Sequence, residues 1–382
     1  MRAVRTIAFV VAAGLAAAPL CLSARGSADS FDWQIPNGFP RPRVPADNPM
    51  TAPKVDLGRH LFYDTRLSAN GTQACASCHQ QAKAFTDGRA QAVGSTGERH
   101  PRGSMSLVNV AYVSALTWAN PLMTRLEDQA LVPMFGSHPI ELGLERPGSD
   151  LTARLRQVPE YARLFPAAFG SIDDPFTIEN VTRALAAFER TILSARSPYD
   201  RYHYDRQDDA VPAAARRGER LFFSEPLSCF RCHGGFTFSG GAEFEGRHEG
   251  GPFAFHNTGL YNLAGALSYP SSGAGLYEIT KSAADVGKFR APTLRNIALT
   301  APYMHDGSIA TLDGVLDHYA AGGRTIAEGP YRGVGHDNVN KSPIVHGFTL
   351  TPGERADILA FLEALTDEDV VRDPRFGNPW SR

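Results

Sequence analysis

Four cysteines stand in two motifs in which a pair of cysteines, separated by two residues, is followed directly by histidine. The motifs consist of Cys75, Cys78 and His79, and of Cys229, Cys232 and His233. Two disulfides or two zinc sites are the other uses of such pairs, but neither requires a histidine directly after both. The spacing is that of covalent haem attachment, with the histidine as an iron ligand. We therefore predict two covalently bound haem c groups.

The chemistry of each iron depends on what occupies the face opposite its histidine. An electron carrier fills both faces with protein ligands, whereas a peroxide-reacting enzyme leaves one iron open. A helix predicted after Thr311 places Leu312, Val315, Leu316 and Tyr319 on one apolar stripe, so Tyr319 points inward. This pattern leaves two readings open, a core tyrosine and a ligand. The methionines that remain as alternative ligands are Met50, Met105, Met123, Met134 and Met304.

An internal repeat surrounds the two motifs. Residues 58–63 (Gly-Arg-His-Leu-Phe-Tyr) precede the first motif, and residues 218–223 (Gly-Glu-Arg-Leu-Phe-Phe) precede the second. The motifs start 154 residues apart, a suitable length for one domain each. We predict a mainly α fold of two cytochrome c-like haem domains with long loops, at residues 29–204 and 205–382.

Helical patterns dominate the rest of the chain. The first runs through residues 178–192, with an apolar stripe on one face and Glu189 and Arg190 on the other. Thr351 and Glu354 form a capping box at the start of a second helix near the C-terminus. Glycine- and proline-rich segments such as residues 234–251 predict loops.

Residues 1–28 have the features of a cleaved secretory signal, with basic residues, an apolar run and small residues before a cleavage site near Ala28. We therefore expect a periplasmic protein. No later run is apolar enough to span a membrane. Removing residues 1–28, which carry three arginines and no acidic residue, takes the formal charge from −2 to −5. This charge argues against nucleic acid as a partner.

Three sets of residues together carry a resemblance. They are the paired haem motifs, residues 289–296 (Phe-Arg-Ala-Pro-Thr-Leu-Arg-Asn) and residues 302–307 (Pro-Tyr-Met-His-Asp-Gly). The chain resembles the bacterial di-haem cytochrome c peroxidase/MauG superfamily from about Leu57 to Asp367, and within it the MbnH-like di-haem enzymes. The resemblance implies hydrogen peroxide as oxidant, a high-valent di-iron(IV) state, and oxidation of tryptophan to kynurenine on an exported, MbnP-like partner protein.

The resemblance also implies a role for Tyr319. In the better-known peroxidases of the superfamily, a methionine fourteen residues after the histidine of the Pro-Tyr-x-His segment ligates the second haem. Counted from His305, that place is Tyr319, and MauG likewise has a tyrosine there as a haem ligand. A phenolate favours ferric and higher oxidation states of iron over the ferrous state.

For the first haem, the resemblance implies a peroxide-reacting site. Glu141 matches the distal glutamate that moves a proton between the two oxygens of bound peroxide, and Gln129 lines the same pocket. His138 replaces the asparagine usual in the family, either as a second proton relay or as a loop residue. His100 is a candidate for a sixth ligand that swings in from a loop, although its position aligns poorly.

The remaining implied residues lie around the second haem and between the two haems. Trp118 corresponds to the tryptophan that bridges the haems. Thr300 and Pro302 match backbone ligands of a calcium ion, but Gly103 stands where the family has an asparagine ligand. Two further cofactor-binding candidates, each also readable as structural, are His256 near the second haem and Arg295 as a partner of a propionate.

Three functions remain open. The first is an oxidase that forms the di-iron(IV) state and oxidises a tryptophan on a partner. The second is a cytochrome c peroxidase that reduces hydrogen peroxide with electrons from a small cytochrome or cupredoxin, and the third is a non-catalytic electron carrier. Tyr319 in place of methionine favours the first over the second, because a reductant-driven peroxidase benefits from a high-potential, methionine-ligated haem. An open first haem would exclude the third.

Overall fold

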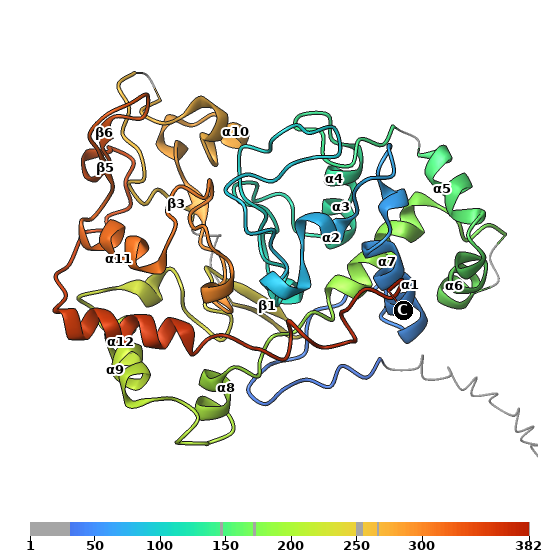
Figure 1. Ribbon diagram of the computed structural model, residues 1–382, viewed down its shortest axis with the longest axis horizontal. Helices are drawn as coiled ribbons and strands as arrows, with labels where there is room; N and C mark the ends of the chain where they lie inside the picture. Colours follow the sequence, from blue (N-terminus) through green and yellow to red (C-terminus); the bar gives the residue numbers. More distant parts are fainter. Residues whose placement is uncertain (1–30, 146–147, 171–172, 250–254, 266, 382) are drawn as a thin grey trace, which may run out of the picture. The chain divides into compact units, whose positions relative to one another are not determined.

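Short helices and long loops make up most of the chain in the computed structural model (Figure 1). The structure describes residues 31–145, 148–170, 173–249, 255–265 and 267–381, so the predicted signal peptide lies outside the described residues. The helices are α1 (Ala52–Phe62), α2 (Cys75–Cys78), α3 (Leu126–Gln129), α4 (Leu131–Phe135), α5 (Ser149–Arg156), α6 (Pro159–Phe169), α7 (Ile178–Glu189), α8 (Pro198–His203), α9 (Ala213–Phe222), α10 (Tyr277–Thr280), α11 (Leu312–Ala320) and α12 (Pro352–Glu363).

Strands are few and very short in the described residues. They form three separate antiparallel pairs. The pairs are β1 (Ala242–Phe244) with β2 (Arg247–Glu249), β3 (Phe255–His256) with β4 (Phe289–Arg290), and β5 (Thr325–Ile326) with β6 (Gly333–Val334). The prediction of a largely helical chain is therefore confirmed. The first pair lies within the segment that was predicted to be only a loop.

The internal repeat appears as two helix pairs with the same close contact. A β-carbon added to Gly58 of α1 would lie 1.9 Å from the carbonyl oxygen of Ala184 in α7. A β-carbon added to Gly218 of α9 would lie equally close, 1.9 Å, to the carbonyl oxygen of Asp357 in α12. Glycine at both positions lets the helices of each pair touch along their backbones. The α12 helix begins with the predicted capping box.

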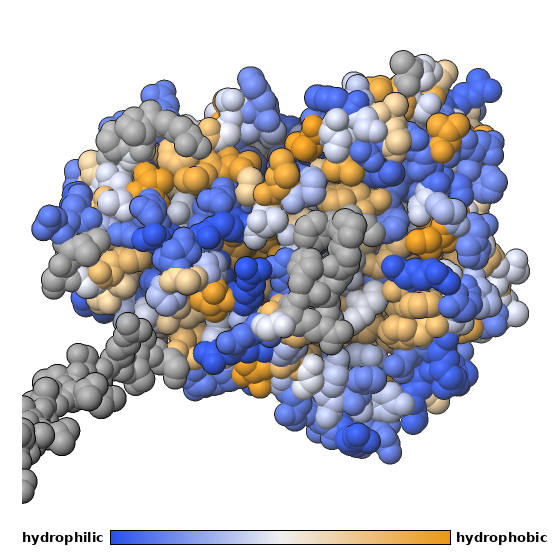
Figure 2. All heavy atoms as spheres, turned by 180° about the vertical axis from the view of Figure 1, so that it is seen from behind, coloured by the Kyte–Doolittle hydropathy of each residue, from blue (hydrophilic) through white to orange (hydrophobic). Residues whose placement is uncertain are grey.

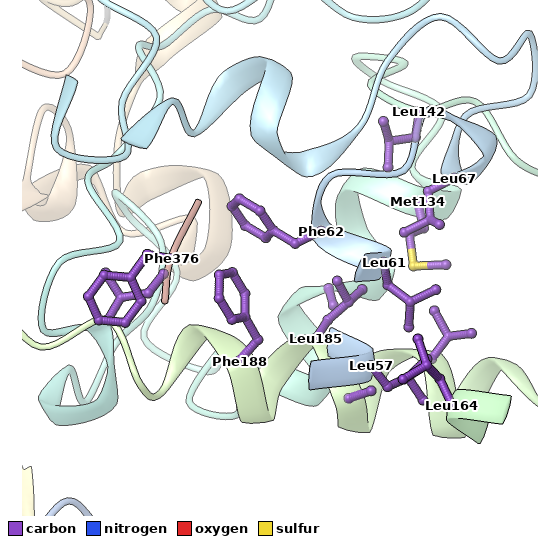
Figure 3. Close-up of a cluster of buried hydrophobic side chains, with 14 of the residues drawn as sticks. Leu57, Leu61, Phe62, Leu67, Met134, Leu142, Leu164, Leu185, Phe188 and Phe376 are labelled. Carbon is purple, nitrogen blue, oxygen red and sulfur yellow. The ribbon is translucent and has the colours of Figure 1, made fainter. Parts of the chain in front are cut away.

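Each helix pair forms part of a separate hydrophobic core that reaches one cysteine motif. Figure 3 shows the core on α1 and α7, where Phe62 and Phe188 face each other with ring centroids 5.2 Å apart. Cys75 packs against this core. The core on α9 and α12 is in contact with Cys229. Each attachment motif is thus held against its own pair of helices.

The C-terminal tail returns to the first half of the chain. Phe376 is buried in the core on α1 and α7, and its carbonyl oxygen accepts a 2.7 Å hydrogen bond from the hydroxyl of Tyr63. The indole of Trp380 donates a 3.0 Å hydrogen bond to the carbonyl oxygen of His60. Residues Phe31–Arg382 form one compact unit, and the division into two domains stays a prediction.

The α7 helix differs from the one-sided pattern expected of it. Glu189 and Arg190 were expected on a polar outer face, but their exposed fractions are only 6% and 4%. Arg190 is neutralised by Glu127, at 2.9 Å, from α3. A buried charge is tolerated when it is paired, and the hydropathy pattern of one helix does not reveal a partner on another.

The surface is mixed in polarity. Figure 2 shows hydrophobic residues in several separate patches among hydrophilic ones on one face of the molecule. Within the described residues, every helix is too short or too polar to cross a bilayer.

Candidate active site

The first cysteine motif lies on α2 and the residue that follows it. Cys75 and Cys78 are free thiols. The Nδ1 atom of His79 lies 2.9 Å from the carbonyl oxygen of Phe85. A carbonyl can only accept, so Nδ1 carries the proton and Nε2 is left as the nitrogen that can bind iron. Burial lowers the pKa of His79, which favours the neutral form that a metal requires.

The second motif has the same arrangement of its histidine. The Nδ1 atom of His233 lies 3.1 Å from the carbonyl oxygen of Pro292 and 3.3 Å from that of Phe238. Burial lowers the pKa of His233 to about 4. Cys229 and Cys232 are free thiols. Both histidines are therefore oriented by backbone carbonyls and kept neutral by burial.

A large apolar cavity opens beside the second motif. It contains about 1400 Å³ of space free of protein atoms, its mouth included. The predicted site residues that line it are Trp118, Cys229, Cys232, His233, His256 and Tyr319. The Nε2 atom of His256 is buried there without a hydrogen-bond partner among the described residues, while Nδ1 contacts the hydroxyl of Ser342 at 3.2 Å. An apolar cavity with an unsatisfied polar atom, two thiols and a neutral histidine fits a covalently attached haem.

Tyr319 lies on α11 and faces this cavity together with His233. The predicted N-cap holds: the hydroxyl of Thr311 accepts a 3.1 Å hydrogen bond from the amide of Gly314. Burial raises the pKa of Tyr319, with smaller contributions from the nearby Cys232 and Cys229 thiols. Its hydroxyl has no hydrogen-bond partner among the described residues, so the structure shows no backbone acceptor of the kind that a core tyrosine uses. Met304 also lines the cavity and remains the alternative ligand.

The guanidinium of Arg295 is fully paired within the protein. It forms two hydrogen bonds to Asp200, at 2.8 and 2.9 Å, and its Nε atom donates to the carbonyl oxygen of Phe236 at 2.7 Å. The side chain is fully buried and is absent from the lining of the cavity. The expectation of a propionate partner here therefore has no support, because all three nitrogens already have acceptors.

Arg290 is better suited than Arg295 to pair with a haem propionate, although it is not among the residues predicted from the sequence. It lines the cavity, and its pKa is lowered to about 10 because the side chain is buried. Its recorded contacts are a 3.2 Å hydrogen bond to the carbonyl oxygen of Thr117 and a 3.4 Å contact with the sulfur of Met105. A buried guanidinium without a carboxylate partner among the described residues is suited to an acidic group of a ligand. The signal was present in the same Phe-Arg-Ala-Pro segment as Arg295.

Glu141 lies beside the first cysteine pair. Burial raises its pKa to about 7. Burial also raises the pKa of the Cys75 and Cys78 thiols, with a smaller contribution from the charge of Glu141. The segment is held against α4, because the amide of Leu142 donates a 2.9 Å hydrogen bond to the carbonyl oxygen of Pro133. A carboxyl group that is half ionised near neutral pH can both accept and donate a proton.

For the other residues expected around the first site, the structure describes no contact with the first cysteine motif. Gln129 is half-buried at the end of α3. His138 is exposed, which favours the reading as a loop residue over that of a proton relay. The Nδ1 atom of His100 accepts a 3.1 Å hydrogen bond from the amide of Arg102. The structure therefore brings Glu141 to the cysteines but shows no such contact for these three side chains.

Glu189 is a second buried carboxyl group near the first motif. One of its oxygens is buried without a hydrogen-bond partner among the described residues, and burial raises its pKa to about 8. Its charge raises the pKa of Cys75, so the two side chains are near each other. The helical pattern predicts a solvent-facing position for Glu189, and this prediction is wrong. The signal in the sequence that could have indicated its burial is its position beside the apolar stripe and next to Arg190.

Trp118 occupies the region between the two sites. Its side chain lines the cavity of the second motif and also a smaller pocket. Thr86 and Asp87 line this smaller pocket, and they directly follow Phe85, whose carbonyl oxygen accepts from His79. The indole nitrogen donates a 2.9 Å hydrogen bond to the carbonyl oxygen of Gly103. This position is compatible with the predicted bridge.

The smaller pocket also collects the residues expected at a calcium ion. Thr300, Pro302 and Gly103 all line it, together with the buried carboxylate of Asp87. Among the described residues no cluster of three or more acidic, histidine or cysteine side chains forms a metal site. Carbonyl oxygens and one carboxylate are hard donors that calcium accepts, so the pocket has the right ligand types but few of them.

Comparisons with known proteins agree with this arrangement. A family model for di-haem cytochrome c peroxidase matches residues 52–209. The chain is 36% identical to cytochrome-c peroxidase IdrP1 of Denitromonas iodatirespirans, with 94% of each chain covered. It is 32% identical to methylamine utilization protein MauG of Methylorubrum extorquens, over 95% of this chain and 94% of that protein.

A solved structure is more similar still. It is a crystal structure of a MauG-like protein associated with microbial copper homeostasis, at 46% identity and a TM-score of 0.88. The match covers 92% of this chain and 99% of that one. The similarity thus extends over both cysteine motifs and the helices that hold them.

Proposed function

Since the chain belongs to the di-haem cytochrome c peroxidase family, whose members are oxidoreductases and include MauG, we propose that it uses hydrogen peroxide to oxidise a tryptophan on a partner protein to kynurenine. The observation that carries the proposal is that Tyr319 and His233 line one cavity. They supply an anionic and a neutral ligand for the second haem, a pair that suits storage of oxidising equivalents.

The haems of this family supply peroxide binding at an open iron and storage of the two oxidising equivalents. The residues of this chain position and move protons around them. Glu141 takes the proton of the inner peroxide oxygen and delivers it to the outer one, for which a pKa near neutrality is well matched. Trp118, held by Gly103, carries an electron between the two sites. His79 and His233, oriented through Nδ1 by backbone carbonyls, would each hold an iron through Nε2.

A reductant-driven cytochrome c peroxidase is the second candidate. Met304 lines the same cavity as Tyr319, and a thioether ligand there would favour that activity. The 36% identical relative is also named a peroxidase. A pure electron carrier would need protein ligands on both faces of each haem, whereas the half-buried Glu141 near the first motif suits an open iron.

Three further proposals accompany this function. We infer that the partner is an exported, MbnP-like protein and that the protein works in the periplasm after cleavage near Ala28. Residues 29–204 and 205–382 act as the two haem domains. The tail at residues 367–381 is an exception, because it packs on the first of these domains. A calcium ion binds the carbonyl oxygens of Thr300 and Pro302.

Peroxide treatment of the holoprotein with candidate exported proteins tests the main proposal. Mass spectrometry should find kynurenine at one tryptophan of the true partner, dependent on peroxide. Tyr319→Phe should abolish it and alter the low-spin ferric signal in electron paramagnetic resonance. Tyr303→Phe is the matched control, because this tyrosine lines the same cavity but its hydroxyl is bonded to the carbonyl oxygen of Ile297. An unchanged ferric signal in Tyr319→Phe would pass the ligand role to Met304.

A further inference from the structure

A continuous series of aromatic rings leads away from the cavity of the second motif. Phe289 and His305 both line the cavity and stack on each other, with centroids 3.7 Å apart and planes at 14°. Tyr269, a third lining residue, has its ring centroid 6.1 Å from each of them. The inner end of the series is therefore exposed to the space that a haem would fill.

The series continues outward through two more tyrosines. The ring of Tyr261 is 5.3 Å from that of Tyr269 and 5.4 Å from that of Tyr331. The exposed fractions are 5% for Tyr269, 5% for Tyr261 and 45% for Tyr331. Tyr331 lies in the turn between β5 and β6, where it and Tyr261 line a solvent-facing pocket that contains about 870 Å³ of space free of protein atoms, its mouth included. The rings thus connect the cavity to the surface in three short steps.

The middle tyrosine has a proton acceptor in place. The hydroxyl of Tyr261 donates a 2.6 Å hydrogen bond to Oδ2 of Asp306, whose Oδ1 accepts from the amide of Ser308 at 3.0 Å. A phenol that loses an electron becomes a strong acid, and a buried one cannot release its proton to water. A carboxylate at hydrogen-bond distance allows the proton to leave and to return.

We propose that Tyr331, Tyr261 and Tyr269 form an electron path by which the protein substrate reduces the oxidised second site. An electron moves from Tyr261 past Tyr269 into the cavity while its phenolic proton moves to Asp306. Tyr261 then regains an electron from Tyr331 and the proton from Asp306, and Tyr331 releases its own proton to water. An aromatic side chain of the partner, touching Tyr331, returns one electron to it, and a proton from water restores its hydroxyl. Two passages remove two electrons for each molecule of peroxide, which is reduced to water. Conversion of tryptophan to kynurenine removes four electrons, so it takes four passages and two molecules of peroxide, with water supplying the oxygen atoms and the formyl carbon leaving as formate. This path rests on the proposed function.

Packing alone would not produce this arrangement. Buried aromatic rings often contact each other in a core, but such a core needs neither an exposed terminal ring nor a carboxylate on its middle member. Trp118 does not offer the same exit, because its indole is bonded to Gly103 between the two sites. Tyr331 is partly exposed and its ring contacts that of Tyr261. The ring of Tyr261 in turn contacts that of Tyr269, which lines the cavity.

Radical trapping tests the path without relying on turnover. The holoprotein is treated with hydrogen peroxide and a nitroso spin trap in the absence of partner, and the adducts are mapped by mass spectrometry. Wild type should carry an adduct on Tyr331. Tyr261→Phe should lose most of it, because phenylalanine is much harder to oxidise. Asp306→Asn should also lose it, because an amide does not take the proton. Tyr277→Phe, a nearby tyrosine outside the series, should keep it.

Two readouts separate this path from the function on which it rests. The absorbance change of the haems with peroxide reports the first reaction, and kynurenine on the partner reports the second. Tyr331→Phe, an exposed change that leaves the core intact, should keep the absorbance change and slow kynurenine formation. Equal labelling of Tyr331 in Tyr261→Phe, or no label in wild type whose haems do react, would overturn the path. A labelled Tyr331 with no partner oxidation would instead remove the proposed substrate and leave the path standing.

Discussion

The proton relay assigned to Glu141 predicts how the peroxide reaction varies with pH. The carboxyl must be ionised to accept the first proton, so the rate should follow its ionised fraction. With a pKa of about 7, that fraction is about 1% at pH 5 and about 90% at pH 8, a rise of about 90-fold. A glutamate with its ordinary pKa of 4.5 would be about 75% ionised at pH 5, and the rate would change less than about twofold.

Stopped-flow absorbance of the haems, with peroxide as the variable, measures this rate between pH 5 and pH 8.5. Glu141→Gln should be slower by roughly 10²–10⁴-fold at pH 8 and should lose the pH dependence. Glu145→Gln is the matched control, because this carboxyl is exposed and only four residues away. A wild-type rate that changes less than about twofold between pH 5 and pH 8.5, or the same pH profile in Glu141→Gln, would show that the proton travels by another group.

Three further outcomes follow from the contacts. Trp118→Phe should preserve the peroxide reaction at the first haem but delay oxidation of the second, as seen by rapid-freeze electron paramagnetic resonance; simultaneous oxidation would exclude the bridge. Gly218→Ala should lower the free energy of unfolding by about 1–3 kcal/mol or more, because its β-carbon meets the Asp357 carbonyl oxygen, whereas Gly353→Ala, with open space around it, should not. The raised pKa of Glu189, about 8, destabilises the folded state as pH rises from about 4.5 to 8. Glu189→Gln should therefore stabilise the protein more at pH 8 than at pH 5, by about 3–4 kcal/mol, as measured by thermal unfolding; an equal effect at both pH values would contradict the burial.

The helices and the repeat could be predicted because they depend on local signals. Thr311 and Thr351 cap the helices predicted to follow them, and each acts through bonds within its own turn. Gly58 and Gly218 head similar segments, and both turned out to be points of backbone contact. The return of Trp380 to α1 had no such signal, since it depends on residues more than 300 positions apart.

The site residues could be predicted where the chemistry of haem attachment requires a particular residue type. They could be predicted less well where the role of a charged side chain depends on whether another residue pairs with it. The histidines of the two motifs and Tyr319 lie where the motif and the helical stripe indicated. Arg290 and Arg295 occur in one segment with similar surroundings in sequence. Only the fold shows that Asp200 neutralises one and leaves the other facing the cavity. The burial of Glu189 was also hidden, because a glutamate beside an apolar stripe looks like a surface residue in the sequence.

The tail that crosses back to α1 makes the order of synthesis matter. Val370 and Phe376 belong to the core that holds Cys75, so this core stays incomplete until these two residues have been made. The core around Cys229 has no such dependence on the tail, since its described members end at Leu365. A chain that stops near residue 369 would therefore damage the first attachment site, nearly 300 residues away, and leave the nearer one intact. The half that is translated first is the half that finishes folding last.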